Sequence, residues 1–154
     1  MSHGVPARLA ECLLCYLLFA ICYLLLNEPQ ASSRLLSQMN VERVKYVIWA
    51  ADSKRAVRFY HEVFGAEVIK ASEVISEVSV GGATIGIHGG GEGKRTWTGM
   101  SFQVPDVIAG AQEIVAAGGQ LTREPQPEGD EPPHLAMCVD TEGNEFMLTR
   151  KRGA

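Results

Sequence analysis

Cysteine is almost absent from most of this chain. Three of its four cysteines, Cys12, Cys15 and Cys22, lie in one apolar run near the N-terminus, and only Cys138 lies beyond it. A disulfide framework therefore cannot be drawn through the rest of the sequence, which fits a reducing compartment. Cys12 and Cys15 have CxxC spacing, but no second ligand pair accompanies them, so we do not expect a zinc or redox site there.

The chain also lacks an excess of basic residues. It has 14 Lys and Arg against 18 Asp and Glu, for a net charge of -4, and the basic residues are scattered. Domains that bind nucleic acid normally present a basic face or stripe, so we expect no nucleic acid partner. With 154 residues, the length allows one globular domain and at most one appendage.

The longest hydrophobic run, residues 9–26, differs from everything that follows it. Only Glu11 interrupts it, and we expect it to form an apolar N-terminal helix. At about 1.5 Å per residue such a helix would reach roughly 27 Å, just short of the usual hydrocarbon thickness. Residues 1–38 are compatible with a membrane anchor, a cleaved secretory signal, or a dispensable extension upstream of a start at Met39. We expect a cytoplasmic protein, associated with a membrane if residues 9–26 are an anchor.

An internal repeat organises the rest of the chain. Asp106 lies 54 residues after Asp52, and Gly119 lies 54 residues after Gly65. Each Asp follows an apolar, strand-like run and precedes an amphipathic helical pattern, which ends in glycine before further short strand patterns. Self-similarity at a fixed offset indicates one supersecondary unit used twice. We therefore predict an α+β domain at residues 41–152 with two β-α-β-β-β modules, residues 41–90 and 97–152.

Local patterns predict the elements of each module. The first module has a strand at residues 44–51, a helix at 53–64, and strands at 67–71, 75–80 and 83–88. The second has a strand at residues 101–104, a helix at 107–117, and strands at 120–123, 135–139 and 145–150. Asp52 is a good N-cap for the first helix, and Gly81-Gly82 is a hairpin turn. Residues 89–98 are expected to be a flexible glycine-rich linker, and residues 124–133 a proline-rich loop.

Three short motifs accompany the repeat. They are FYHEVFGAEV at residues 59–68, AGG at residues 117–119 and DTEGNEFML at residues 140–148. With the repeat they resemble the vicinal oxygen chelate superfamily, which includes glyoxalase I, bleomycin-resistance proteins and extradiol dioxygenases. The resemblance covers about residues 41–152 and implies a glyoxalase-like half-barrel around a ligand cup. These motifs are structural, so they do not identify a reaction.

The resemblance also implies where a metal would bind. Metal-dependent members hold a divalent ion with a His or Gln on the first strand and a Glu on the fourth strand of each module. The corresponding positions here are Lys45, Gly86, Gly99 and Met147, none of which is a usual metal ligand. We therefore expect no metal cofactor; a divalent metal held by an altered ligand set is the alternative.

Alternation along the expected strands places several side chains in that cup. His88 and Lys45 are the candidate catalytic residues, with a half-exposed strand-end histidine and a snorkelling lysine as the plainer interpretations. Trp49 is either a stacking platform or part of the core. The candidate ligand-binding residues are Trp49, Ser101, Gln103, Glu145, Met147 and, at a loop mouth, His134.

Three functions are compatible with this pattern. The first is a small-molecule-binding protein of the glyoxalase and bleomycin-resistance type without the usual metal centre. The second is a lyase, isomerase or dioxygenase-type enzyme, using either a metal held by His88 and Glu145 or no cofactor and the pair Lys45 and His88. The third is a membrane-tethered scaffold module. We expect a homodimer, because half-open sheets leave edges that a second copy closes.

Overall fold

The computed structural model describes residues 39–152. Among these, residues 41–152 belong to one compact unit. The expected apolar helix at residues 9–26, and with it the three interpretations of residues 1–38, lie outside the described residues. Within the described part of the chain, no helix is long and apolar enough to cross a membrane.

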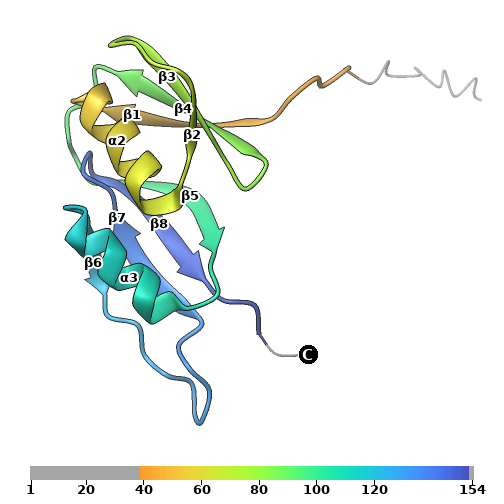
Figure 1. The fold of residues 1–154 in the computed structure, drawn as a ribbon, viewed down its shortest axis with the longest axis vertical. Helices are drawn as coiled ribbons and strands as arrows, with labels where there is room; N and C mark the ends of the chain where they lie inside the picture. Colours follow the sequence, from red (N-terminus) through yellow and green to blue (C-terminus); the bar gives the residue numbers. More distant parts are fainter. Residues whose placement is uncertain (1–38, 153–154) are drawn as a thin grey trace, which may run out of the picture. The chain divides into compact units, whose positions relative to one another are not determined.

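The first module is a four-stranded sheet with one helix (Figure 1). Its elements are β1 (Lys45–Ala50), α2 (Ser53–Phe64), β2 (Glu67–Lys70), β3 (Ile75–Val80) and β4 (Ala83–Gly89). The strand order is β1-β4-β3-β2, with β1 parallel to β4 and the other neighbours antiparallel. Along β1, Ile48 and Ala50 are buried while Val47 and Trp49 are more than half exposed, so only one face of this sheet packs into the core.

The second module repeats this arrangement. Its elements are β5 (Thr96–Gln103), α3 (Val107–Ala116), β6 (Gln120–Arg123), β7 (Leu135–Val139) and β8 (Asn144–Thr149). The strand order β5-β8-β7-β6 is the same as in the first sheet, with β5 parallel to β8. The predicted α+β fold of two β-α-β-β-β modules is therefore confirmed.

Both helices begin at the repeated aspartates. The Asp52 carboxylate accepts hydrogen bonds from the backbone N–H groups of Lys54 and Arg55, and Asp106 does the same for the first turn of α3. α2 ends at Gly65, whose φ of 61° is left-handed and favours glycine. These signals explain why the bounds expected for the first helix agree with the structure.

The expectation for residues 96–98 was wrong. They belong to β5, so the strand begins five residues earlier than the expected residue 101, and the linker before it is shorter. The strand register shifts between Trp97 and Ser101, and Gly99 has a φ of 72°. Thr98 stabilises this bulge, because its hydroxyl donates to the Glu145 carbonyl and accepts from the Met100 N–H. The bulge interrupts the alternation by which a strand is recognised in a sequence.

The two modules share one core. Phe64, at the end of α2, stacks on Phe102 of β5 with ring centroids 4.1 Å apart and packs edge-on against Phe146 of β8. Phe59 and Tyr60 of α2 are also buried in this aromatic cluster. The first helix therefore packs on the second sheet as well as on its own.

Candidate ligand-binding site

The helix-free face of the first sheet carries the candidate residues of the first module. Trp49 is 56% exposed, and its ring meets the ring of His88 edge-on with centroids 5.4 Å apart. The two residues are neighbours in the β1–β4 register. Lys45, two rows away on the same face, pairs with Glu77 of β3 at an Nζ–Oε1 distance of 2.5 Å. The structure thus brings Lys45, Trp49 and His88 to one face, while their roles remain predictions.

Glu77 is a residue that the sequence interpretation missed. The Lys45 hydrogen bond lowers the pKa of its carboxyl, although partial burial opposes this effect. The alternation of Ile75, Glu77 and Ser79 along β3 would have placed it beside Gly86, with which it pairs in register. The alternation along β3 could therefore have identified Glu77. It was missed because β3 contributes none of the superfamily's usual metal ligands.

The helix-free face of the second sheet carries the other candidates. Ser101 lies beside Met147, and its hydroxyl is 3.1 Å from that of Thr149. Gln103 is exposed in the next row. The Glu145 carboxylate is already paired with Arg95, at an Nε–Oε1 distance of 2.7 Å. Any ligand contact by Glu145 would therefore compete with this ion pair.

His134 lies apart from the other candidates, in the second module. Its Nδ1 is 3.1 Å from a carboxylate oxygen of Glu128, and its Nε2 is 2.9 Å from Nη2 of Arg152. It lines a small cavity of about 130 Å³ together with Arg123 and Met137, and no other candidate residue lines that cavity. The structure therefore ties His134 to the proline-rich loop and the C-terminal segment.

One junction between the modules is closed by buried polar groups of the β7–β8 turn. The Glu142 side chain is fully buried. Its carboxylate accepts from the backbone N–H of Asp52 at 2.9 Å and from Nε of Arg55 at 2.6 Å. Asn144, the first residue of β8, donates through Nδ2 to the carbonyl of Trp49 at 3.0 Å. The second module thus holds both the start of α2 and the end of β1.

Asp140 belongs to the same group of buried polar residues. We call Asp140, Glu142 and Asn144, with their hydrogen-bond partners in the first module, the polar clasp. The Asp140 carboxylate accepts from the Tyr60 hydroxyl at 3.1 Å and from two backbone N–H groups of its own turn. Burial raises the pKa of Asp140, an effect that its hydrogen bonds to Asn144 partly oppose. Burial also raises the pKa of Tyr60 well above its ordinary value, so the phenol stays protonated and donates.

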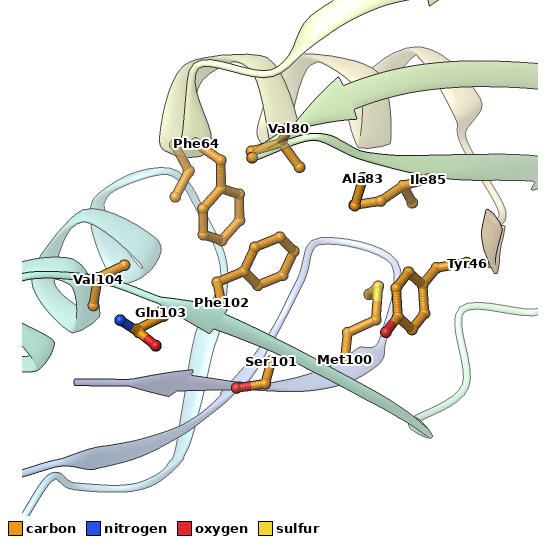
Figure 2. A pocket seen from close by; sticks show the side chains of 12 residues that line it. Tyr46, Phe64, Val80, Ala83, Ile85, Met100, Ser101, Phe102, Gln103 and Val104 are labelled. Atoms are coloured by element: carbon orange, nitrogen blue, oxygen red, sulfur yellow. The ribbon is translucent and has the colours of Figure 1, made fainter. Parts of the chain in front are cut away.

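The internal repeat implies a second junction between the modules, equivalent to the one that the clasp closes, and this second junction is open. By the 54-residue offset, Gln103 corresponds to Trp49. The β7–β8 turn that carries the clasp corresponds in the first module to the short turn Gly81-Gly82 between β3 and β4, and Gly81 lines the same cavity as Gln103. Glycines carry no side chain that could cross the junction. A cavity of about 560 Å³ remains there, bordered by the hairpin, the end of α2, Tyr46 of β1 and the second half of β5 (Figure 2).

The cavity between the modules is mainly apolar. Figure 2 shows Phe64 and Phe102 on one side and Met100 beside the Tyr46 ring on the other. Among the described residues that line it, polar side chains are confined to Tyr46, Ser101 and Gln103, and none is charged. Its volume lies in the range of sites that hold a small molecule, and so does its lining of apolar walls with a few polar groups.

The residues at the superfamily's metal positions do not fit a divalent ion. Gly86 and Gly99 offer no side-chain donor, Met147 offers only a thioether, and Lys45 brings a positive charge. Within residues 39–152, no cluster of three or more His, Cys, Asp or Glu side chains is arranged to hold a metal. Hard divalent ions prefer carboxylate, carbonyl or imidazole ligands.

Two four-stranded sheets, each with the order first-fourth-third-second and one helix, are the paired modules that the resemblance to the vicinal oxygen chelate superfamily implies. The chain belongs to the glyoxalase-like domain family, whose model matches residues 45–149. No match was found among curated proteins.

Solved structures with this fold include proteins of several bacteria. The chain is similar to the fosfomycin resistance protein FosX of Listeria monocytogenes, with 20% identity, a TM-score of 0.62, and coverage of 75% of this chain and 95% of that one. It is also similar to a glyoxalase/bleomycin resistance protein/dioxygenase family enzyme of Burkholderia phytofirmans, with 21% identity, a TM-score of 0.56, and coverage of 68% and 94%. One FosX structure was solved with Mn(II) and sulfate bound. At these identities the likeness establishes the fold alone.

Proposed function

We propose that this chain binds a small, uncharged molecule in the cavity between its two modules, without a metal cofactor. The observation that carries the proposal is the cavity of about 560 Å³ with aromatic and thioether walls. Its size suits a small ligand, and the open edge of β5 beside it offers backbone groups that can orient the ligand. A charged ligand would lie there without a partner, because the lining residues of the described chain carry no charge.

The difference between the two junctions supports this site. The clasp fills one junction with Glu142, Asp140 and Asn144, and each of them has hydrogen-bond partners. The other junction is open because its turn is made of Gly81 and Gly82. Fold members such as FosX have been solved with a small molecule bound, in that case 1S,2S-dihydroxypropylphosphonic acid. That ligand is charged, so the site proposed here would differ from it in ligand class.

The cavity can be tested by filling it. Ala83 lines the cavity, so Ala83→Met should occupy part of it and lower the affinity for the neutral fluorophore N-phenyl-1-naphthylamine at least tenfold. The matched control is Ala109→Met on the exposed side of α3, which should bind as the unaltered chain does. The readout is fluorescence titration, with thermal unfolding to verify the fold. Absence of saturable binding, or equal affinity of the Ala83→Met variant, would refute the proposal.

We also propose a homodimer. Within residues 39–152, β1 and β5 each pair with a strand on one side only, so each has one open edge. Val47, Trp49 and Trp97 are each more than half exposed nearby. Open edges and apolar side chains of this kind are commonly covered by a second copy. Sedimentation velocity of the full-length chain should give twice the mass of the monomer, and a monomer at micromolar concentration would contradict this.

A further inference from the structure

The cavity of about 560 Å³ runs along the open edge of β5. Side chains from both faces of this strand line it: Met100, Phe102 and Val104 from the core face, and Ser101 and Gln103 from the other (Figure 2). Because successive side chains alternate between the faces of a strand, a cavity lined from both faces lies along the strand's edge. Backbone groups of β5 therefore border the cavity together with its side chains.

The backbone of Gln103 faces this edge. On the opposite side of β5, the Val104 N–H donates to the Thr149 carbonyl of β8 at 2.8 Å. The residues of a strand bond alternately to its two sides, so the N–H and C=O of Gln103 face the side that no strand of the described chain covers. Neither group is hydrogen-bonded within residues 39–152. Gln103 thus offers one donor and one acceptor side by side at the cavity.

The closed junction shows how the equivalent carbonyl is satisfied. Trp49 is the counterpart of Gln103 by the 54-residue offset. Its carbonyl accepts from the side-chain amide of Asn144 at 3.0 Å. A carboxamide from the other module therefore reaches the edge of β1 at the position where Gln103 lies on β5.

Ala83 takes the place of Asn144 at the open junction. Gly86 and Met147 occupy equivalent places in the two strand registers, and they lie three residues after Ala83 and Asn144, respectively. Ala83 lines the cavity, but its methyl group has no donor for the Gln103 carbonyl. The amide group that closes one junction is therefore missing from the other.

We propose that the ligand of this cavity is a neutral aromatic lactam that pairs with the backbone of Gln103. The inference rests on the proposed function, because it concerns the same cavity. The lactam N–H donates to the Gln103 carbonyl, and the lactam C=O accepts from the Gln103 N–H. This amide replaces the one that Asn144 supplies at the closed junction. The fused ring lies against the apolar walls at Phe64 and Phe102, which suit a flat uncharged group.

The test compares 2-quinolinone with N-methyl-2-quinolinone, using the full-length chain and backbone amide NMR. The two probes differ only in the methyl group that replaces the lactam hydrogen. 2-Quinolinone should bind saturably and shift the Gln103 amide resonance more than any other amide of β5. N-methyl-2-quinolinone should bind at least tenfold more weakly, because the enclosed Gln103 carbonyl would lose its donor.

Two substitutions at one position separate the backbone of Gln103 from its side chain. Gln103→Ala keeps both backbone groups and should bind 2-quinolinone within twofold of the unaltered chain. Gln103→Pro removes the N–H and should lower the affinity at least tenfold. An edge strand accommodates proline where the N–H points away from the ladder, and thermal unfolding verifies the fold. The comparison of the two probes tests the same pairing in the unaltered chain.

Several results would overturn this inference. Equal affinity for the two probes would show that the lactam N–H is not recognised, and an equal loss in Gln103→Ala and Gln103→Pro would assign recognition to the side chain. N-phenyl-1-naphthylamine has no carbonyl, so it should bind Gln103→Pro as it binds the unaltered chain. Saturable binding of this fluorophore without discrimination between the quinolinones would refute the lactam and leave the cavity standing. Absence of binding by all three compounds would refute the proposed function itself.

Discussion

Tyr60 is the largest fully buried side chain among the described residues, and its hydroxyl makes a hydrogen bond from one module to the other. Its hydroxyl donates to Asp140, which lies 80 residues away in the sequence. Desolvating a phenol is costly without such a partner. A single residue thus contributes both apolar area to the shared core and a hydrogen bond to the clasp.

Tyr60→Phe should destabilise the protein by about 1–2 kcal/mol, because the Asp140 carboxylate loses a donor in a buried setting. The measurement is the free energy of unfolding from urea denaturation. The control is Tyr46→Phe, which removes the same hydroxyl from a ring that is about half exposed. It should change the stability by less than about 0.5 kcal/mol, as is usual for surface positions. Equal effects of both variants would show that the clasp contributes nothing at Tyr60.

Residue by residue, the sequence placed the candidate residues correctly but missed their partners. The alternation rule placed Lys45, Trp49 and His88 on one face, and the structure has them there. It did not show that Lys45 is paired with Glu77, because the partner lies on another strand and its register depends on the hairpin between them. Nor did it show the clasp, whose contacts join turns and helices from different modules.

At the scale of elements, the two helices have the same beginning and different ends. Each starts at an aspartate that accepts from two backbone N–H groups of the first turn. α2 then closes at a left-handed Gly65, whereas the glycine with positive φ after α3 is Gly118, one residue beyond Ala117. The repeated aspartate is therefore the conformational signal that both modules share.

Asp106→Ala should lower the free energy of unfolding by about 1 kcal/mol, the usual effect of losing an N-cap. Asp106 is exposed and its side chain makes only the capping bonds among the described contacts, so the effect isolates the cap. Asp106→Asn keeps an acceptor in place and should recover most of the loss. If Asp106→Asn were as destabilising as Asp106→Ala, the cap would not explain the start of α3.

The elements that were predictable from sequence are those with local signals. The helix at residues 53–64 has a cap, an apolar stripe and a glycine stop, and its bounds agree with the structure. β3, β6 and β7 also agree, because turn residues bound each of them. The start of β5 was missed because Thr96–Thr98 follow a glycine-rich segment and precede the bulge at Gly99. A bulge is stabilised by the partner strand, which a local pattern does not contain.

At the scale of the whole described unit, duplication has produced two unequal junctions. The clasp closes one of them through buried hydrogen bonds, while the Gly81-Gly82 hairpin leaves the other open. The repeat predicted that two modules would face each other, and the shared aromatic core confirms that they pack together. It did not predict which junction would be open, because that depends on the lengths and side chains of two turns.

The central claim is that the open junction is a ligand site, and methyl NMR of the full-length chain tests it most directly. Val80, Ile85 and Met100 have methyl groups at the cavity, whereas Val107 and Ile114 are buried core residues of α3. On titration with N-phenyl-1-naphthylamine, the account predicts saturable shifts of the cavity methyls with little change at Val107 and Ile114. Saturable shifts confined to methyls outside the cavity, or no saturable shift at all, would contradict it.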